Sequence, residues 1–479
     1  KRTAEQAPAP PPPAPAGAAA VIVLSGCASF SADGGADRVA ELTRARTGQS
    51  PRPVRTEADA ELARARVAEL LAAPLTPDAA VELAFLQNPG LQAGFAGLGI
   101  AEADLVQAGR LRNPTLSFGR LREGGGAVEI DRAIVFDVLG LLTMPLQQDI
   151  ARRRFGQAQL RVAQAAVGLA ADTREAWFTA VASAELLRYQ RQVMDAADAS
   201  RTLAERMRAV GNVSALAQWQ EQAFHADATV RLAEAGHQAL AHRERLTRLL
   251  GLSDPLAFTL PERLPALPDA PVSSHDAEQA AMDRRLDVLL ARGDTADTAR
   301  SLGLTRATRF VNVLAVGYQN QSVTGEPRAD GFEVELSLPL FDFGATRAAR
   351  AEATYRQAMQ RTAQVAVDAR SEVREAHAAY RTRYALARHY RDEVVPLRKR
   401  ISDENLLRYN GMLVSVFDLL ADAREQVASV AGHVVALRDF WIAETRLQAA
   451  LSGRSRADAA PAADTPATPA PGTPPAAAH

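Results

Sequence analysis

The sequence predicts a mainly α-helical protein that also carries four β-strands, with one order of elements occurring twice along the chain. Two observations lead to this prediction. Two segments of more than sixty residues, 141–210 and 345–409, each contain a single proline and are typical of long, continuous helices. Two shorter segments, each with glycine at its centre, separate runs that have the composition of β-strands.

The composition agrees with a helical protein and excludes several kinds of partner. The 479 residues include 55 Lys and Arg against 56 Asp and Glu, so the chain lacks the positive field that attracts nucleic acid. Aromatic residues make up only 5%, and the other apolar residues are mostly Ala, Leu and Val, which suit long helices in close contact. The single cysteine, Cys27, excludes a disulfide framework and a thiolate metal site.

The lengths of the predicted helices indicate an extended architecture. At 1.5 Å per residue, the helices 141–210 and 345–409 would each be about 100 Å long, too long for a compact domain. Four shorter helices are predicted at 76–110, 213–251, 276–306 and 412–452. Each pair of short helices, stacked end to end, matches one long helix in length.

The last of these helices carries the apolar spacing of a coiled coil. Its apolar residues recur every three or four positions over four heptads, which favours a coiled-coil seam, although an ordinary buried helix face has the same spacing. The seam consists of Leu413, Val416, Leu420, Ala423, Val427, Val430, Val434, Leu437 and Trp441.

The four predicted strands occupy 114–122, 127–139, 310–322 and 332–340. In the last strand, five apolar residues from Phe332 to Leu340 alternate with Glu333, Glu335 and Ser337. This alternation is typical of a strand with lipid on one face and water on the other, and it predicts that these three polar residues face the lumen of a barrel. A half-buried strand of a soluble sheet has the same period. Beyond residue 26 no run of 18 apolar residues exists, so a membrane would have to be crossed by strands closed into a barrel.

An internal duplication explains why two hairpins occur in a helical chain. The tripeptide at Pro145 resembles that at Pro339, an offset of 194, and Gly211 matches Gly411, an offset of 200. Both glycines are expected to adopt a positive φ where the chain reverses between helices. The predicted organisation is a signal (1–26), an N-terminal extension (27–75), a first repeat (76–260), a proline-rich linker (261–275), a second repeat (276–453) and an Ala/Pro-rich tail (454–479).

The context of Cys27 resembles a bacterial lipoprotein signal. Lys1 and Arg2 precede a short apolar run that ends in Leu24-Ser25-Gly26-Cys27, similar to the lipobox, whose cysteine becomes the lipidated first residue of the mature chain. Ala28 follows instead of an aspartate that would retain the protein at the inner membrane, which implies sorting to the outer membrane. The alternative is a chance cysteine after a membrane-spanning anchor.

Taken together, these features resemble the TolC-type outer-membrane efflux family, in particular its lipidated members. The motifs that carry the resemblance are Asn88-Pro89-Gly90-Leu91, Arg112-Asn113-Pro114-Thr115-Leu116, Leu338-Pro339-Leu340-Phe341-Asp342-Phe343-Gly344 and Arg408-Tyr409-Asn410-Gly411-Met412-Leu413-Val414-Ser415. The sequence departs from the family at Arg285-Leu286-Asp287, where a proline is more usual after the arginine, and around Pro145, where the Phe-Asp-Phe-Gly turn is missing.

The resemblance implies a homotrimer with a twelve-stranded membrane β-barrel and a long coiled-coil α-barrel that extends into the periplasm. Such a protein is the lipid-anchored exit duct through which an inner-membrane efflux transporter, joined by a periplasmic adaptor, exports substrates. The resemblance further implies a gate formed by Asp418 and Asp422. The surface that contacts the adaptor would consist of Val210, Gly211, Asn212, Val213, Ser214, Tyr409, Asn410, Gly411, Met412 and Leu413.

The other classes of protein have weaker support. The eight histidines are scattered, and His237 and His242 are not four residues apart, so no catalytic or metal site is expected. No cofactor is expected either. A lipidated coiled-coil adaptor or a structural envelope protein is the alternative, although neither would need the duplication or lipid-facing strands. The sequence does not indicate whether the exported substrates are drugs or metal ions.

We predict that Cys27 carries acyl chains such as palmitate and that the mature protein partitions with the outer membrane, because a lipobox is the one role that this single cysteine fits. Intact mass after membrane fractionation checks this. Soluble protein with an unmodified Cys27 would contradict it. Cys27→Ala is expected to trimerise still, because barrel closure and not the lipid satisfies the strand edges.

Overall fold

The computed structural model describes residues 29–122, 124–271, 283–311 and 313–453, which form two compact units. Of the described residues, the sheet unit comprises those within 29–35, 96–159 and 293–358, and the helical unit comprises those within 36–95, 160–271, 283–292 and 359–453. The predicted signal, Cys27, part of the linker and the C-terminal tail lie outside the described residues.

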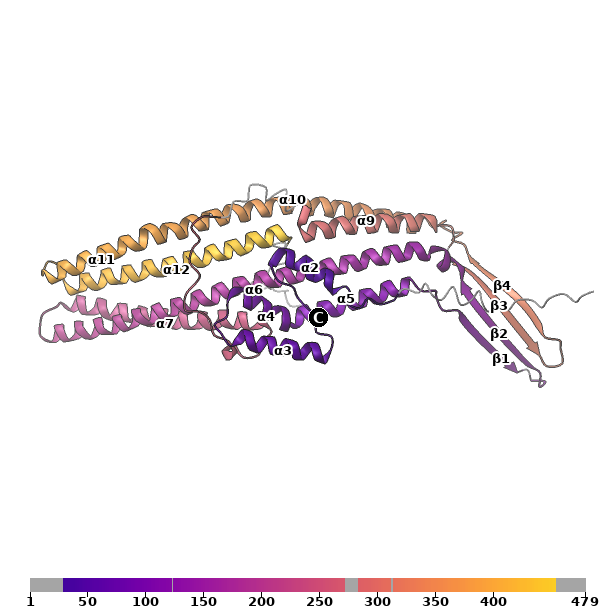
Figure 1. Cartoon of the computed structure of the whole chain (residues 1–479), viewed down its shortest axis with the longest axis horizontal. Helices are drawn as coiled ribbons and strands as arrows, with labels where there is room; N and C mark the ends of the chain where they lie inside the picture. The colour runs from indigo at the N-terminus through magenta and orange to yellow at the C-terminus, as the bar shows by residue number, and fades with distance from the viewer. Residues whose placement is uncertain (1–28, 123, 272–282, 312, 454–479) are drawn as a thin grey trace, which may run out of the picture. The chain divides into compact units, whose positions relative to one another are not determined.

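The sheet unit contains the two predicted hairpins, joined into one antiparallel sheet with the order β1-β2-β3-β4 (Figure 1). The strands span Thr115–Arg122 (β1), Val128–Asp137 (β2), Val313–Val323 (β3) and Ala329–Ser337 (β4). Gly126 and Gly325 take positive φ angles of 91° and 92° in the two hairpin turns, a conformation that favours glycine. The prediction that the last strand reaches residue 340 is wrong, because Pro339 cannot donate a hydrogen bond to the ladder.

The connections between the sheet and its neighbouring helices differ between the two internal repeats. α5 (Pro89–Ala108) precedes β1, and α9 (Leu286–Ala307) precedes β3. α6 (Val138–Ala209) begins directly after β2, whereas residues 338–344 form a loop between β4 and α10 (Ala345–His389). Pro145 therefore lies inside α6 while Pro339 lies in this loop, so the equivalence predicted for these two prolines is wrong.

Both long helices form as predicted. α6 is one helix of 72 residues that includes Pro145. α10 continues through a π-helical turn, Tyr390–Val394, into α11 (Val395–Asn410). The π turn comes directly before Pro396, where a proline ring would clash with the carbonyl four residues back in a regular helix.

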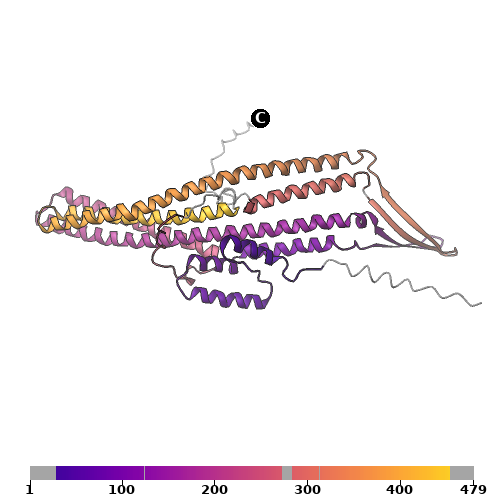
Figure 2. The same cartoon turned by 45° about the horizontal axis from the view of Figure 1, so that its top comes forward.

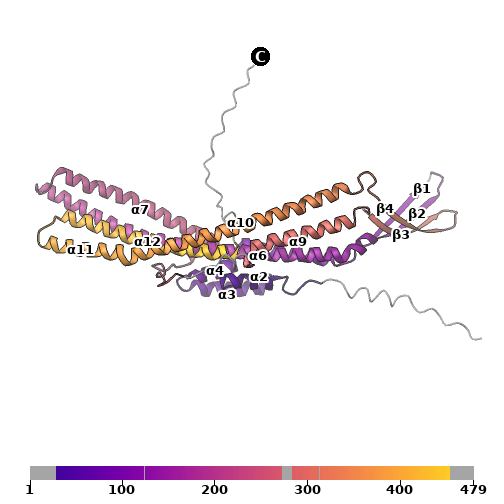
Figure 3. The same ribbon diagram turned by 90° about the horizontal axis from the view of Figure 1, so that it is seen from above.

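The helical unit is built on two antiparallel pairs of helices, α6 with α7 (Ala215–Leu250) and α11 with α12 (Val416–Ser452) (Figure 3). Three shorter helices, α2 (Ala36–Thr47), α3 (Glu57–Leu71) and α4 (Pro77–Gln87), lie beside this bundle (indigo in Figure 2), and α3 packs against α4. No helix among the described residues is both long enough and apolar enough to cross a membrane.

An aromatic cluster in the core of the helical unit joins the two helix pairs. Trp177 of α6 is fully buried and donates a hydrogen bond from Nε1 to the carbonyl of Leu75 at 2.8 Å. Its neighbour Phe178 stacks on Trp441 of α12 with 5.5 Å between the ring centroids. Phe440, beside Trp441, packs against Tyr380 of α10. Aromatic contacts of this kind contribute roughly 0.5–1.5 kcal/mol beyond the area that they bury.

The short helix predicted at 76–110 is in fact two helices, α4 and α5, which meet at Asn88. Pro89 pushes the residue before it out of the helical region, and Asn88 has φ −65° and ψ 116°. The Asn88 side chain then serves both neighbouring helices: Oδ1 accepts from the backbone N–H of Leu91 in α5, and Nδ2 donates to the carbonyl of Leu249 at 3.0 Å, in the last turn of α7.

The second internal repeat has the same kind of helix junction, formed by a different side chain. Arg285 precedes α9 as Asn88 precedes α5, and its Nη1 donates to the carbonyl of Ala450 at 2.8 Å, in the last turn of α12. Both α7 and α12 end on a left-handed glycine, Gly251 and Gly453, packed against the backbone at the start of the next short helix. The short helices therefore stack end to end, as their lengths predict. The first seven residues of the predicted helix 276–306 lie outside the described residues.

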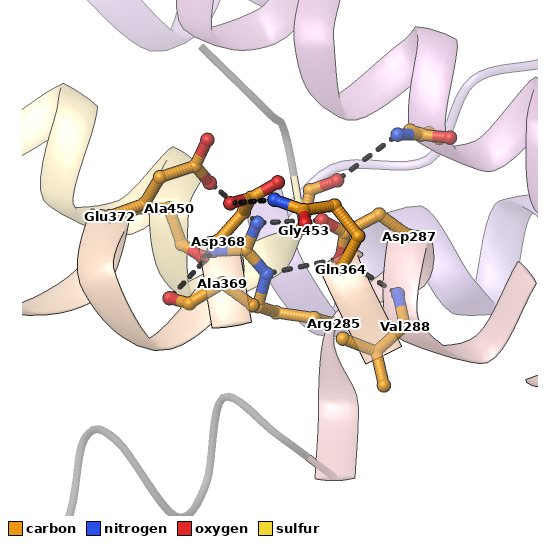
Figure 4. A network of polar contacts seen from close by, with 10 residues as sticks. Arg285, Asp287, Val288, Gln364, Asp368, Ala369, Glu372, Ala450 and Gly453 are labelled. Carbon is orange, nitrogen blue, oxygen red and sulfur yellow. Dashed lines mark hydrogen bonds and ion pairs between the residues drawn. The ribbon is translucent and has the colours of Figure 1, made fainter. Parts of the chain in front are cut away.

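Arg285 is fully buried (0% exposed), and its charge is satisfied by two carboxylates (Figure 4). Asp287 accepts a bidentate pair of hydrogen bonds at 2.6 and 3.0 Å, and Glu372 of α10 accepts another at 2.7 Å. The carbonyls of Ala369 and Ala450 accept from Nη1. One side chain thus connects α9, α10 and α12. The tripeptide Arg285-Leu286-Asp287, where the sequence departs from the family motif, therefore supplies two members of a buried ion-pair network.

We predict that Arg285→Leu destabilises the helical unit by about 3–5 kcal/mol, because it leaves Asp287 and Glu372 without their cation. Arg38→Leu is the matched control, since Arg38 pairs with Glu41 at the exposed surface and such pairs contribute about 0–1 kcal/mol. Thermal unfolding followed by circular dichroism measures both. Equal melting temperatures would contradict the role assigned to Arg285.

Candidate functional site

The register of the sheet gives it one apolar and one polar face. Residues directly opposite each other in an antiparallel ladder share a face. Tyr318 pairs with Phe332 and Ile134, and Ile134 pairs with Leu116, so an apolar row crosses all four strands. Towards the hairpin turns this face also carries Arg120, Arg122, Arg132, Asn320 and Asp330. Its apolar part, which we call the apolar face, lies towards the start of β1 and consists of Leu116, Phe118, Ile134, Phe136, Leu314, Val316, Tyr318, Phe332, Val334 and Leu336.

The opposite face mixes polar residues with small or apolar ones such as Val135 and Ala315. Its polar residues include Ser117, Asp131, Gln319, Gln321, Glu333, Glu335 and Ser337. The three residues predicted to face water thus lie together on one face, and Phe332, Val334 and Leu336 lie together on the other. Leu338, also predicted to face lipid, lies in the loop beyond β4. Strands of 8 to 11 residues with one apolar face are close to the length that crosses a membrane in a tilted barrel.

The first helical turn, between α6 and α7, has the conformation that the sequence predicts. Gly211 takes a φ of +81°, and the N–H of Asn212 donates to the carbonyl of Met207 at 2.8 Å, which closes the end of α6. Ser214 then caps α7, because its side chain accepts from the backbone N–H of Ala217.

The second turn differs from the prediction. Gly411 has a φ of −81°, and Met412 takes the left-handed conformation with a φ of +59°. The N–H of Leu413 donates to the carbonyl of Arg408 at 2.9 Å, and Ser415 caps α12. Met412 is therefore the structural equivalent of Gly211, at an offset of 201, because the same backbone hydrogen bonds and the same capping serine surround it. The positive φ predicted for Gly411 is wrong.

Both turns lie at the same end of the helical unit (Figures 1 and 3) and expose apolar side chains there. Met412 is 93% exposed, and Val210, Tyr409 and Leu413 are exposed as well. Of the residues predicted at the two turns, Val213 alone is half-buried. Exposed apolar side chains on firmly capped turns are typical of a docking surface.

The two predicted gate residues have different surroundings. Asp418 is exposed and forms a capping box with Ser415: its Oδ2 accepts from the backbone N–H and the hydroxyl of Ser415, at 3.0 and 2.7 Å. These hydrogen bonds lower the pKa of Asp418 below the ordinary range of an aspartate. Asp422, one turn further along α12, is 9% exposed, and its Oδ2 is buried without a hydrogen-bond partner among the described residues.

A polar network that the sequence analysis missed ties the two helix pairs together near these turns. Glu221 of α7 is buried and accepts from Ser200 of α6 and from the guanidinium of Arg424 of α12. Arg424 also lies over the ring of Phe224, 3.6 Å from its centroid. Nothing in the sequence pairs these residues, because Glu221 and Arg424 are 203 positions apart.

Solved structures with a similar fold include outer-membrane channels and other outer-membrane proteins. The chain is similar to the CmeC channel of Campylobacter jejuni (16% identical, TM-score 0.68, 79% of this chain and 85% of that one). It is also similar to VceC of Vibrio cholerae (16%, 0.64, 79% and 96%) and to the open state of the MtrE channel of Neisseria gonorrhoeae (16%, 0.61, 78% and 88%). No model of a protein family and no curated protein matches the sequence.

We predict that the two sheet faces tolerate charge differently. Leu336→Arg should lower the stability of the membrane-inserted protein by roughly 2–4 kcal/mol, and its neighbour Glu335→Arg by much less, because these residues lie on opposite faces. Denaturant titration of protein refolded into lipid vesicles measures both. Equal tolerance at the two positions would mean that neither face contacts lipid.

We predict opposite effects of substitution at the two turns. Gly211→Ala should destabilise the first turn by about 1 kcal/mol, because alanine is strained at positive φ. Met412→Gly should stabilise the second turn by about 0.5 kcal/mol. It relieves the strain of the left-handed conformation, and the greater backbone entropy of glycine in the unfolded state offsets part of this gain. Hydrogen exchange of the amides at the starts of α7 and α12 reports both. Alanine fits the φ of −81° at Gly411, so destabilisation by Gly411→Ala similar to that by Gly211→Ala would contradict the assignment of Met412 as the strained residue.

Proposed function

We propose that this chain, which has the fold of the TolC-type outer-membrane channels, forms the exit duct of an efflux system in the outer membrane. The observation that carries the proposal is the four-stranded sheet with one apolar face and two free edges, attached to long helices. Neither an enzyme nor a soluble helical protein needs such a sheet.

The sheet supports a closed barrel made of several copies. The free edges of β1 and β4 carry unpaired backbone N–H and C=O groups, which lipid cannot satisfy. Two copies would supply eight strands, a number at which side chains fill the interior. Three copies supply twelve strands and leave room for a water-filled lumen lined by the polar face. We therefore propose a homotrimer, anchored in addition by lipid at Cys27, whose helices extend into the periplasm.

The exposed turns support a partner at the far end of the helices. A periplasmic adaptor that links the duct to an inner-membrane transporter would contact the apolar side chains around Val210 and Met412. This transporter would select the substrate, and the duct would release it passively. The adaptor class is the alternative function for this chain, but the apolar sheet face disfavours it, because an adaptor has no use for lipid-facing strands.

The gate is assigned to Asp418, with Asp422 one turn behind it. In a trimer, three copies of the exposed Asp418 carboxylate would form an acidic ring that attracts cations. Separation of the helix pairs would break the bond between Glu221 and Arg424 and leave a buried carboxylate without its cation. The arrangement of helices described here therefore has a specific contact to lose, and binding of an adaptor that separates the pairs would have to offset this loss.

We predict that Asp418→Asn weakens block of the channel by divalent cations in planar bilayers. Asparagine removes the charge, yet its amide oxygen can still accept hydrogen bonds from Ser415. Ser415→Ala is the matched control, because it removes the cap and keeps the carboxylate. The block should also be present at neutral pH and lost as the pH falls through the lowered pKa of Asp418, because only the ionised carboxylate attracts cations.

Conductance itself tests the proposed function. A purified parent protein that inserts into bilayers without forming channels would contradict it. If Asp418→Asn conducts and is blocked like the parent while Ser415→Ala is not, the ring lies elsewhere.

A further inference from the structure

We propose that neighbouring copies pair β4 with β1 so that Ser337 lies opposite Thr115, and that this register seats Phe341 of one copy in a pocket at the start of β1 of the next. The inference rests on the proposed closed trimer and adds to it a residue-level contact between copies. Three observations carry it: the register within the chain, the exposed loop after β4, and the cavity beside β1.

The register between copies follows from the internal duplication. Within the chain, β2 pairs with β3, and Glu129 lies opposite Val323, so the numbers of paired residues add up to 452. Between copies, β4 takes the place of β2 and β1 takes the place of β3. In the first hairpin the numbers of paired residues add up to 250, as for Thr115 with Val135, and in the second they add up to 650, as for Val313 with Ser337. The two sums differ by 400, so the strands of the second hairpin lie on average 200 residues after those of the first. The difference of 400 fixes only the sum of the two shifts. We take both shifts as 200, and the register between copies then stays 452, which places Ser337 opposite Thr115.

The polarity of the strands agrees with this register. It places Leu336 opposite Leu116 and Val334 opposite Phe118, so the apolar face continues from one copy to the next. On the other face it places Glu335 opposite Ser117. A slip by one residue would put the apolar side chains of β4 on the polar face of the neighbour. The strand directions agree as well, because β1 starts at the end of the sheet where β4 finishes (Figure 1).

The loop after β4 presents Phe341 on a well-ordered turn. Phe341 is 105% exposed, whereas the turn around it is held by several hydrogen bonds. The N–H of Phe343 donates to the carbonyl of Pro339 at 2.8 Å, and Nε of Arg309 donates to the carbonyl of Phe343 at 3.2 Å. Phe343 takes a strained φ of +49° in this turn. A ring that is held exposed on a hydrogen-bonded turn loses little conformational freedom when a partner covers it, so Phe341 is well placed for such a contact.

The pocket lies at the start of β1, at the same end of the sheet as this loop. Its volume is about 520 Å³, and its apolar lining comes from Leu111, Phe136, Leu141 and Met144. The mouth carries Arg110 and the ion pair of Arg112 with Asp137, with 2.8 Å between the charged atoms. A guanidinium beside an apolar pocket also suits an aromatic ring.

The two features meet only between copies. Phe341 lies in the loop that directly follows Ser337, and Leu111 lies in the segment that directly precedes Thr115, so pairing of Ser337 with Thr115 brings the loop of one copy to the pocket of the next. Within one chain, β1 and β4 are separated by three strand spacings, about 14 Å. The pocket of one chain therefore cannot be filled by its own loop, and a second copy of the chain is the occupant that continues the edge pairing.

The contact is tested by disulfide cross-linking of the full-length, membrane-inserted protein. Phe341→Cys is combined with Leu111→Cys, which lines the pocket, and the matched control combines Phe341→Cys with Asn113→Cys, two residues further along the same segment. Disulfides need Cα atoms about 5.5 Å apart, so only the correct register should react well. After oxidation, a heated non-reducing gel should show several times more covalently linked trimer for the 341/111 pair than for the control pair.

A second measurement covers the case in which cysteines disturb the loop. Phe341→Ser should lower the temperature at which native trimers dissociate on gels, whereas Phe341→Leu should dissociate close to the temperature of the parent protein. Leu256→Ser, at an exposed position of the helical unit, should have no effect. Native trimers that cross-link better through the control pair, or that dissociate at the parent temperature with Phe341→Ser, would overturn this contact while leaving the trimer intact. Absence of native trimers from the parent protein would overturn the proposed function and this contact together.

Discussion

Every strand edge in a membrane must find a hydrogen-bonding partner, and the assembly proposed for this chain follows from that requirement. The sheet of four strands has an apolar face that water does not favour and two edges that lipid cannot satisfy. Closure with further copies of the chain satisfies both conditions at once. Because each chain carries four antiparallel strands, β4 of one copy is already antiparallel to β1 of the next, and a ring of copies closes without a change of pattern.

The helical unit solves a related problem at its junctions. A short helix that ends in the interior leaves carbonyl groups without partners. In both internal repeats, the residue before the next short helix supplies the hydrogen-bond donor. Asn88 does so with a neutral amide, at 3.0 Å from the carbonyl of Leu249. Arg285 does so with a guanidinium, and its buried charge then requires Asp287 and Glu372. The duplication thus preserves the hydrogen bond at each junction and not the residue that makes it.

The sequence predicted those features that follow from local periodicity. Long helices, two hairpins and the alternation of Glu333 and Glu335 with apolar neighbours were all predictable, because each depends on the spacing of residues along one element. Helices α2 and α3 were missed, since they lie in a segment that was treated only as an extension. The positive φ at Met412 could not be predicted, because Gly411 beside it is the residue that normally adopts this conformation. The buried role of Arg285 and the pairing of Glu221 with Arg424 depend on contacts between distant helices, which periodicity does not contain.

Closure of the sheet by further copies is tested most directly by native mass spectrometry of the protein extracted from membranes in detergent. The protein should appear as a complex of three chains, because twelve strands are needed for a lumen lined by the polar face. Monomers that retain the complete sheet, or complexes with a different number of chains, would contradict this arrangement.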